Sequence, residues 1–147
     1  MAKTSTPVYK QQAVTSIDNA SGTLTDITST NSTITVALQR QSSETYVFGD
    51  DTAIQGIGKS TGTVSGTIVY STNATEARAM YNQWYFSAEG TARTVTVDVP
   101  DSSTGSDRYS GELVLNSFTP VDGDAGSGEL MMMQVEMKGP ISWTIIA

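Results

Sequence analysis

The chain has 147 residues, no cysteine and no histidine, and eight lysines and arginines against fifteen aspartates and glutamates, which gives a net charge of −7. This length accommodates one domain with a sizeable core, so we expect a single domain over 1–147. The composition excludes disulfides, thiolate metal sites and histidine catalysis, and the acidic balance disfavours tight binding to nucleic acid phosphates.

The N-terminal segment 1–12 is polar, contains one proline and shows no hydrophobic period. We predict an extended N-terminal arm here, with a frayed terminus as the alternative. The segment lacks the apolar stretch of a signal peptide, and no apolar run in the chain reaches membrane-spanning length. We therefore expect no membrane partner.

Most of the chain has the composition of strands and turns, since Ser, Thr and Gly alternate with Val, Ile, Tyr and Met. No strand–helix–strand alternation is present, so the sheets should be mainly antiparallel. The predicted fold is all-β, a β-sandwich or partly closed barrel with one flanking helix. The predicted strands cover 14–18, 24–28, 33–41, 62–71, 91–99, 108–118, 129–138 and 141–145.

Two of these strands alternate clearly between apolar and polar residues. In 33–41 the apolar positions are Ile34, Val36 and Leu38, and in 129–138 they are Met131, Met133, Val135 and Met137. Such strands have one face toward a core and one toward water. The methionines are expected in the core, because methionine fills irregular gaps; a methionine binding surface is the alternative.

The segment 42–61 is long and shows no clear period. Loops of this length inside a compact domain are usually functional or disordered. Tyr46, Val47 and Phe48 argue against disorder. We predict a long loop over 42–61 that packs on a neighbouring copy of the chain.

The segment of about 74–89 is predicted to form the one convincing helix, because apolar residues recur in it at steps of three and four. Asn73 can cap its first turn, with Glu76 completing a capping box. The apolar stripe must be buried on a sheet, and we expect it to be helix-core packing. Its members are Ala77, Met80, Tyr81, Trp84 and Ala88.

Two motifs suggest ligand chemistry on first inspection. Ala53 to Ser60, A-I-Q-G-I-G-K-S, resembles a relaxed phosphate-binding loop ending at Lys59, but the β-branched residues that follow predict a strand in place of the required helix. Asp122 to Glu129 has calcium-like carboxylates, but neither its glycines nor its glutamate have the spacing of a helix–loop–helix calcium site. A glycine-rich loop and an acidic hairpin turn are the favoured interpretations.

Two acidic pairs, Asp50 with Asp51 and Asp98 with Asp101, are close enough in sequence for acid–base work. Acids this close are usually solvated loop charges. No catalytic site remains, so we expect a chain that is not an enzyme and binds neither a metal nor a cofactor.

Several stretches in order resemble the tail tube (major tail) proteins of tailed bacteriophages. They are the segment I-D-N-A-S-G-T-L-T-D-I at Ile17 to Ile27, Y-V-F-G-D at Tyr46 to Asp50, the strand over 62–70, the strand over 109–118, and the closing V-x-M-K-G-P-I-S-W. The chain departs from the family pattern at Val47-Phe48, where threonine is common, and in the polar insert 102–107.

The resemblance implies a β-sandwich subunit that closes into rings of six, which stack into a hollow tube in the virion tail. It implies assembly in the host cytoplasm, with the tape measure, tail terminator and distal tail proteins as partners and DNA as transient cargo. The implied inter-subunit residues are Tyr46, Val47, Phe48, Asp50, Asp51 and Ile54. We expect a subunit without Tyr46 to Asp51 to fold but not stack.

On the same basis, the polar faces of the alternating strands are candidates for the channel lining. The residues are Thr35, Gln39, Gln134 and Glu136. Three alternatives remain: a related secretion-tube subunit, a carbohydrate-binding or adhesin-like module with Trp84, Tyr85 or Trp143 as its platform, and a nucleotide hydrolase at Lys59.

Overall fold

The computed structural model describes residues 13–19, 21–49, 54–73, 76–87, 91–124, 126 and 128–147. The predictions made for the arm 1–12, for Asp50 and Asp51, and for Ala88 lie outside the described residues.

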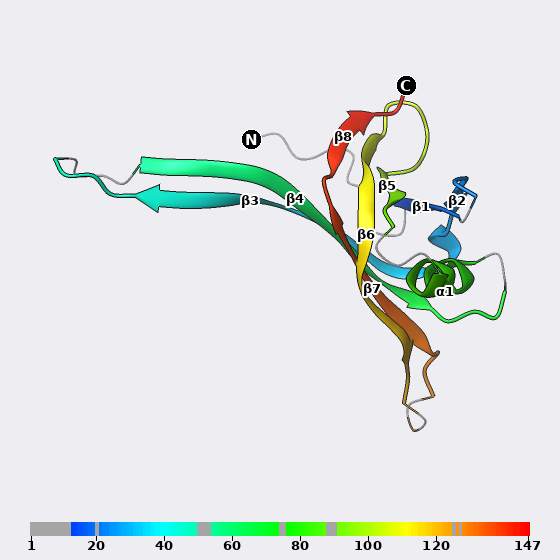
Figure 1. Ribbon diagram of the computed structural model, residues 1–147. Helices are drawn as coiled ribbons and strands as arrows, with labels where there is room; N and C mark the ends of the chain where they lie inside the picture. Colours follow the sequence, from blue (N-terminus) through cyan, green and yellow to red (C-terminus); the bar gives the residue numbers. More distant parts are fainter. Residues whose placement is uncertain are drawn as a thin grey trace, which may run out of the picture.

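The described residues form eight strands and one α-helix (Figure 1), as the sequence predicted for the fold class. Every strand pairing among them is antiparallel. The strands are β1 (Val14–Asp18), β2 (Leu24–Asp26), β3 (Asn31–Thr45), β4 (Ile54–Val69), β5 (Arg93–Val99), β6 (Asp107–Asp122), β7 (Met132–Gly139) and β8 (Ser142–Ile145), and the helix is α1 (Ala77–Ser87).

The strands make two sheets that share β6. The first sheet contains β2, β1, β5, the first half of β6 and β8, and the second contains β3, β4, β7 and the second half of β6. β6 pairs with β5 up to Leu113 and with β7 from Val114 onward. The sheet does not close into a barrel, since β2 and β3 lie at opposite ends of the strand order.

Glycines allow the backbones to approach closely where the two sheets diverge. A Cβ atom at Gly139 would lie 2.6 Å from the Glu112 carbonyl oxygen, and one at Gly111 would collide with the Pro140 carbonyl oxygen. Only glycine permits such contacts. They lie beside the point where β6 passes from one sheet to the other.

The core lies between the sheets and continues under α1. In the second sheet, Val36, Val64, Met137 and Leu115 occupy one row across four strands, with their apolar side chains toward the core. Met133 and Met137 are completely buried, while Met131, just before β7, is exposed.

The helix α1 lies against β6 through aromatic contacts. The ring centroid of Phe118 on β6 is 6.3 Å from that of Tyr81 and 5.7 Å from that of Tyr85. The Trp84 indole N–H donates to the Thr91 carbonyl at 2.8 Å, and the Arg93 guanidinium lies 5.5 Å from the Trp84 ring centroid. These contacts fix the helix on the sandwich.

Several predicted bounds differ from the structure, since β3 and β6 extend beyond 33–41 and 108–118, and β7 begins at Met132 and not at 129. The predicted second strand ends at Asp26, whose carboxylate accepts from the Thr28 backbone N–H at 2.8 Å and leads into a short 3₁₀ turn. The segment predicted as a loop over 42–61 is mostly strand, because β3 and β4 stay paired out to Thr45 and Ile54. Figure 1 shows this pair as a hairpin that extends well beyond the sandwich.

Candidate assembly surfaces

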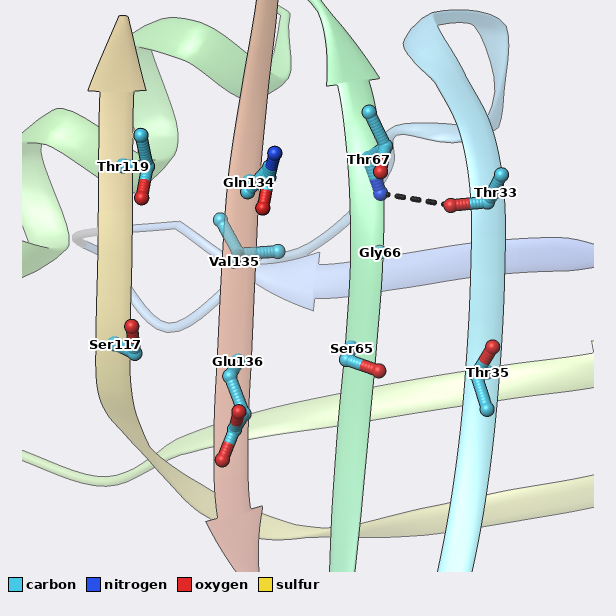
Figure 2. Close-up of a pocket in the computed structure, with 10 residues that line it drawn as sticks. All are labelled: Thr33, Thr35, Ser65, Gly66, Thr67, Ser117, Thr119, Gln134, Val135 and Glu136. Atoms are coloured by element: carbon cyan, nitrogen blue, oxygen red, sulfur yellow. Dashed lines mark hydrogen bonds between the residues drawn. The ribbon is translucent and has the colours of Figure 1, made fainter. Parts of the chain in front are cut away.

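The outer face of the second sheet is polar across all four strands. In one row Thr35, Ser65, Glu136 and Ser117 are neighbours, and in the next row Thr33, Thr67, Gln134 and Thr119 are neighbours. Figure 2 shows the side chains of both rows projecting from β3, β4, β7 and β6. We call these eight residues the polar face.

The structure places three predicted channel-lining residues, Thr35, Gln134 and Glu136, together on the polar face. Gln39 lies four residues beyond Thr35 on β3, opposite Thr61, and so shares its side of the strand. β4 and β6 also contribute to the polar face, which the predicted lining residues did not include. The signal was available, since Ser65 and Thr67 alternate with the apolar Val64 and Ile68.

Hydrogen bonds and one ion pair connect the polar face internally and to the neighbouring Asp122 and Lys138. The Thr67 backbone N–H donates to the Thr33 hydroxyl at 3.0 Å, and Gln134 Nε2 donates to Asp122 Oδ2 at 2.7 Å. Glu136 lies 3.4 Å from the exposed ammonium of Lys138. An array of hydroxyls and amides presents no apolar surface for another macromolecule to adhere to.

The second sheet has two free edges among the described residues. β3 pairs with β4 on one side only, and β6 from Val114 to Asp122 pairs with β7 on one side only. These edges lie at opposite ends of the four-stranded sheet. Unpaired backbone groups along a strand are a template for pairing with another chain.

Exposed apolar side chains gather at the outer end of the β3–β4 hairpin. Phe48 is fully exposed, Tyr46 is 77% exposed, and Val47 and Ile54 are exposed as well. We call these four residues the hairpin tip. Apolar side chains held this far from a core gain burial only from a partner.

The predicted apolar stripe of the helix lies in the core. Ala77, Met80, Tyr81 and Trp84 are buried. Burial raises the pKa of the Tyr81 phenol far above its ordinary value.

Of the three predicted platform residues, Trp84 cannot present its ring to a ligand, and Tyr85 and Trp143 lie on separate surfaces. Trp84 is buried, whereas Tyr85 and Trp143 are exposed. Tyr85 packs near Phe118 and Trp143 pairs opposite Tyr109. Phe118 lies nine positions after Tyr109 along β6, a distance of about 30 Å.

Asp98 is buried in an ion pair, and it does not pair with Asp101. Its carboxylate accepts from Arg108 Nε at 2.8 Å and Nη2 at 3.0 Å, and from the Ser102 hydroxyl at 2.8 Å. Burial favours a higher pKa, but the hydrogen bonds from Arg108 and Ser102 and the charge of Arg108 outweigh it, so the pKa of Asp98 lies below its ordinary value. Asp101 accepts instead from Ser103 and Ser106.

The other motifs with possible chemistry have structural roles. Lys59 lies within β4, so a strand follows the glycine-rich motif, as predicted. A phosphate-binding loop would need a helix N-terminus at this position. Asp122 ends β6. Across the described ranges, no three acidic side chains come together as a metal site. Within the same residues, no helix has the length and apolar character needed to cross a bilayer.

Comparison with known proteins finds similarity in structure and not in sequence. No protein-family model matches the chain, and no curated protein matches it significantly.

Solved structures, in contrast, match it over nearly its whole length. A chain in the tail of an empty gene transfer agent particle, solved with C6 symmetry, superposes with a TM-score of 0.70 at 16% identity, covering 94% of this chain and 99% of its own. A chain of the sheath–tube complex of an extracellular contractile injection system gives 0.72 at 13% identity, covering 97% and 94%. A chain of the SPP1 tail tube gives 0.66 at 12% identity, covering 96% and 77%. The fold of this chain is therefore the fold found in these tail and tube assemblies.

Proposed function

We propose that the chain is the structural subunit of a tail tube, in a phage or in a related injection particle. Identical copies join side by side into rings of six, and the rings stack into a hollow conduit. The observation that carries the proposal is the agreement in fold with tail and tube chains over at least 94% of this chain. In this role the chain has no reaction to catalyse.

Ring closure uses the two free edges of the second sheet. When β3 of one copy pairs with the second half of β6 of the next, each contact is head-to-tail, and a repeated head-to-tail contact closes into a ring when its rotation permits. Pro120 limits the pairing, since it has no N–H to donate. The sheets of all copies then form one continuous wall.

Axial stacking uses the hairpin tip. Tyr46, Val47, Phe48 and Ile54 become buried when the tip of one copy reaches a copy in the adjacent ring. Burying an aromatic or large aliphatic side chain contributes about 1.5–3 kcal/mol, so a tip with four such residues can hold two rings together. Asp50 and Asp51 belong to the same segment of sequence.

The polar face lines the channel in this arrangement, because the opposite face of the same sheet is occupied by the core. Thr35, Gln39, Gln134 and Glu136 contribute to the lining. DNA passes as transient cargo, and the tape measure occupies the lumen before it. An acidic chain of net charge −7 repels nucleic acid, so the cargo does not adhere to the wall.

The remaining partners are those of a tail: further copies of the chain, a tail terminator and the distal tail proteins. One solved structure with this fold belongs to the tube-terminating cap of the anti-feeding prophage, and another to its baseplate. Assembly takes place in the host cytoplasm, and the product is in the virion tail.

Electron microscopy of the purified protein over a range of concentrations tests this proposal. We expect rings and stacked tubes with a central channel. Monomers that stay dispersed at high concentration, also by sedimentation velocity, contradict it. Glycan binding by such monomers would support the binding-module alternative instead.

A further inference from the structure

A groove of about 1180 Å³ lies between the two sheets, beside the free edge that β3 forms. One wall is the apolar side of β3, with Ile34, Val36 and Leu38, and the other contains Val97 and Val99 from β5. Ile34 and Val36 are half-buried, and Leu38, two residues farther out, is 56% exposed. The described residues of one subunit therefore leave the apolar side of β3 partly uncovered.

A pair of exposed aromatic side chains lies near the other free edge of the second sheet. Tyr85 and Phe86 are in the last turn of α1, with ring centroids 5.2 Å apart, and they are 41% and 66% exposed. The Tyr85 ring also lies 5.7 Å from that of Phe118, on the half of β6 that pairs with β7 on one side only. We call Tyr85 and Phe86 the aromatic pair.

The direction of α1 brings the aromatic pair to this edge. Near the start of the helix, the Arg78 guanidinium donates to the Ser71 carbonyl, just after β4. Near its end, Tyr85 contacts Phe118 on β6. Because β7 separates β4 from β6, the helix crosses the sheet and ends beside β6.

The groove and the aromatic pair belong to the same face of the second sheet. Ile34, Gly66, Val135 and Phe118 form one row across the four strands, so Ile34 in the groove and Phe118 under α1 both lie on the core side. The three pairings that connect β3 to β6 are antiparallel. The two free edges therefore run in opposite directions, and rotated copies can join them by a further antiparallel pairing.

We propose that the aromatic pair of one copy fills the groove of the next copy in the ring. This inference rests on the proposed function, since the contact between β3 and β6 of adjacent copies brings the two surfaces together. The occupant is a second copy because the chain carries the groove at one edge and the aromatic pair at the other. Within one subunit, β3 and β6 are three strand spacings apart, about 14 Å.

The aromatic pair adds apolar burial to a contact otherwise made by backbone hydrogen bonds. An aromatic side chain buries about 150–250 Å² when it is fully covered, so the exposed fractions of Tyr85 and Phe86 correspond to about 200 Å². A standard protein interface buries about 800 Å² per partner. The aromatic pair thus supplies roughly a quarter of such an interface.

The absence of cysteine permits a direct test with a short bismaleimide cross-linker. The test variant combines Leu38→Cys with Phe86→Cys, and both positions are exposed, so neither substitution opens the core. The matched control combines Gln39→Cys with Phe86→Cys, because Gln39 is the next residue along β3 and lies on its opposite face. Rings are purified by size-exclusion chromatography, verified by electron microscopy, cross-linked and then denatured.

We expect the test variant to give a ladder of covalent oligomers of up to six copies on a denaturing gel, and the control to remain monomeric. A mixture of the two single variants, Leu38→Cys and Phe86→Cys, should give dimers only, because each contact joins position 38 of one copy to position 86 of the next. Rings of the test variant that do not cross-link overturn the inference and leave the tube proposal intact, as does equal cross-linking in the control. Wild-type protein that forms no rings overturns both.

A second measurement does not require the cysteine variants to assemble. Phe86→Ser should raise the protein concentration at which rings appear by about tenfold, because it removes apolar cover at every contact around the ring. The rings that do form should still stack, since the hairpin tip is unchanged. Gln83→Ser is the control, an exposed polar residue of the same helix, and should have no effect. An unchanged concentration for Phe86→Ser overturns the inference.

Discussion

The inner and outer halves of the β3–β4 hairpin differ in side-chain pattern and in burial. Over 31–38 and 61–69 the strands alternate, with hydroxyl side chains on one face and Val36, Val64 and Ile68 on the core side. Over 39–45 and 54–60 the side chains are mainly Gln, Ser, Thr and Gly, and the residues of β3 are exposed without exception. The same two strands are thus held by core burial at one end and by their own backbone hydrogen bonds at the other.

The difference shows which half of the hairpin is stabilised within one subunit and which half is not. An isolated two-stranded hairpin is marginally stable in water at best. The outer half nevertheless ends in the apolar hairpin tip. A selection for monomer stability alone would shorten such a hairpin, whereas a selection for contact with another molecule would keep it.

The largest loss in the free energy of unfolding is expected for a substitution of Trp84 in the core. Trp84→Ala removes a side chain that is 2% exposed, together with its hydrogen bond to Thr91, and should cost about 4 kcal/mol of the free energy of unfolding. The control is Phe86→Ala on the same helix, where the ring is 66% exposed. Urea unfolding followed by circular dichroism measures both, and equal losses would contradict the assignment of Trp84 to the core.

The buried ion pair should have a smaller effect that depends on pH. Arg108→Met leaves the Asp98 carboxylate, 1% exposed, without its charged partner and should cost about 3 kcal/mol at neutral pH. The pKa of Asp98 is lowered in the folded state, so the pair stabilises the fold above the ordinary pKa of an aspartate, about 4, and this contribution is lost as the pH falls through the lowered value.

The gap in stability between wild type and Arg108→Met should therefore shrink as the pH falls through the acidic range in which Asp98 takes up its proton, first in the variant and then in wild type. Lys138→Met is the control, since Lys138 is exposed, Glu136 is partly exposed, and surface pairs contribute about 0–1 kcal/mol. Unfolding measured at a series of pH values decides the matter. A gap that stays constant into strong acid would show that Arg108 acts through packing and not through charge.

The smallest effect on folding, and the sharpest on assembly, is expected at the hairpin tip. Phe48→Ser should change the free energy of unfolding by less than about 0.5 kcal/mol, because Phe48 is fully exposed. Under the proposed function it should leave single rings and few stacked ones in electron micrographs. Phe86→Ser is the matched control for an exposed aromatic elsewhere. Tubes of normal length from Phe48→Ser would exclude the tip from stacking.

The bounds of an element could be predicted from the sequence where one face of that element is buried. The predicted bounds of β1 agree with the structure, and α1 lies inside the predicted 74–89, because the apolar period records burial directly. Polar residues at alternate positions likewise marked Thr35, Gln134 and Glu136 as one face. Ser65 and Thr67 complete that face, but only the register between strands shows it.

The outer half of the hairpin could not be predicted for the same physical reason. Gln41 to Thr45 on β3 carry no alternation, since both faces of the strand are exposed, and Gly56 and Gly58 on β4 resemble loop residues. The division of β6 between two sheets could not be predicted from the sequence either. Its residues 107–122 form one strand, and the change of partner after Leu113 depends on contacts with Gly139 and Pro140, more than twenty residues away in sequence.

That division of β6 has a mechanical consequence. A pull on the edge at Val114 to Asp122 passes along one polypeptide backbone into the strand's first half, which is clamped between β5 and β8. The load therefore travels through covalent bonds from one layer to the other, and separating the layers would mean tearing β6 out of two sheets at once. A closed wall of such subunits would therefore resist stretching around its circumference, because each subunit carries the load along one continuous strand.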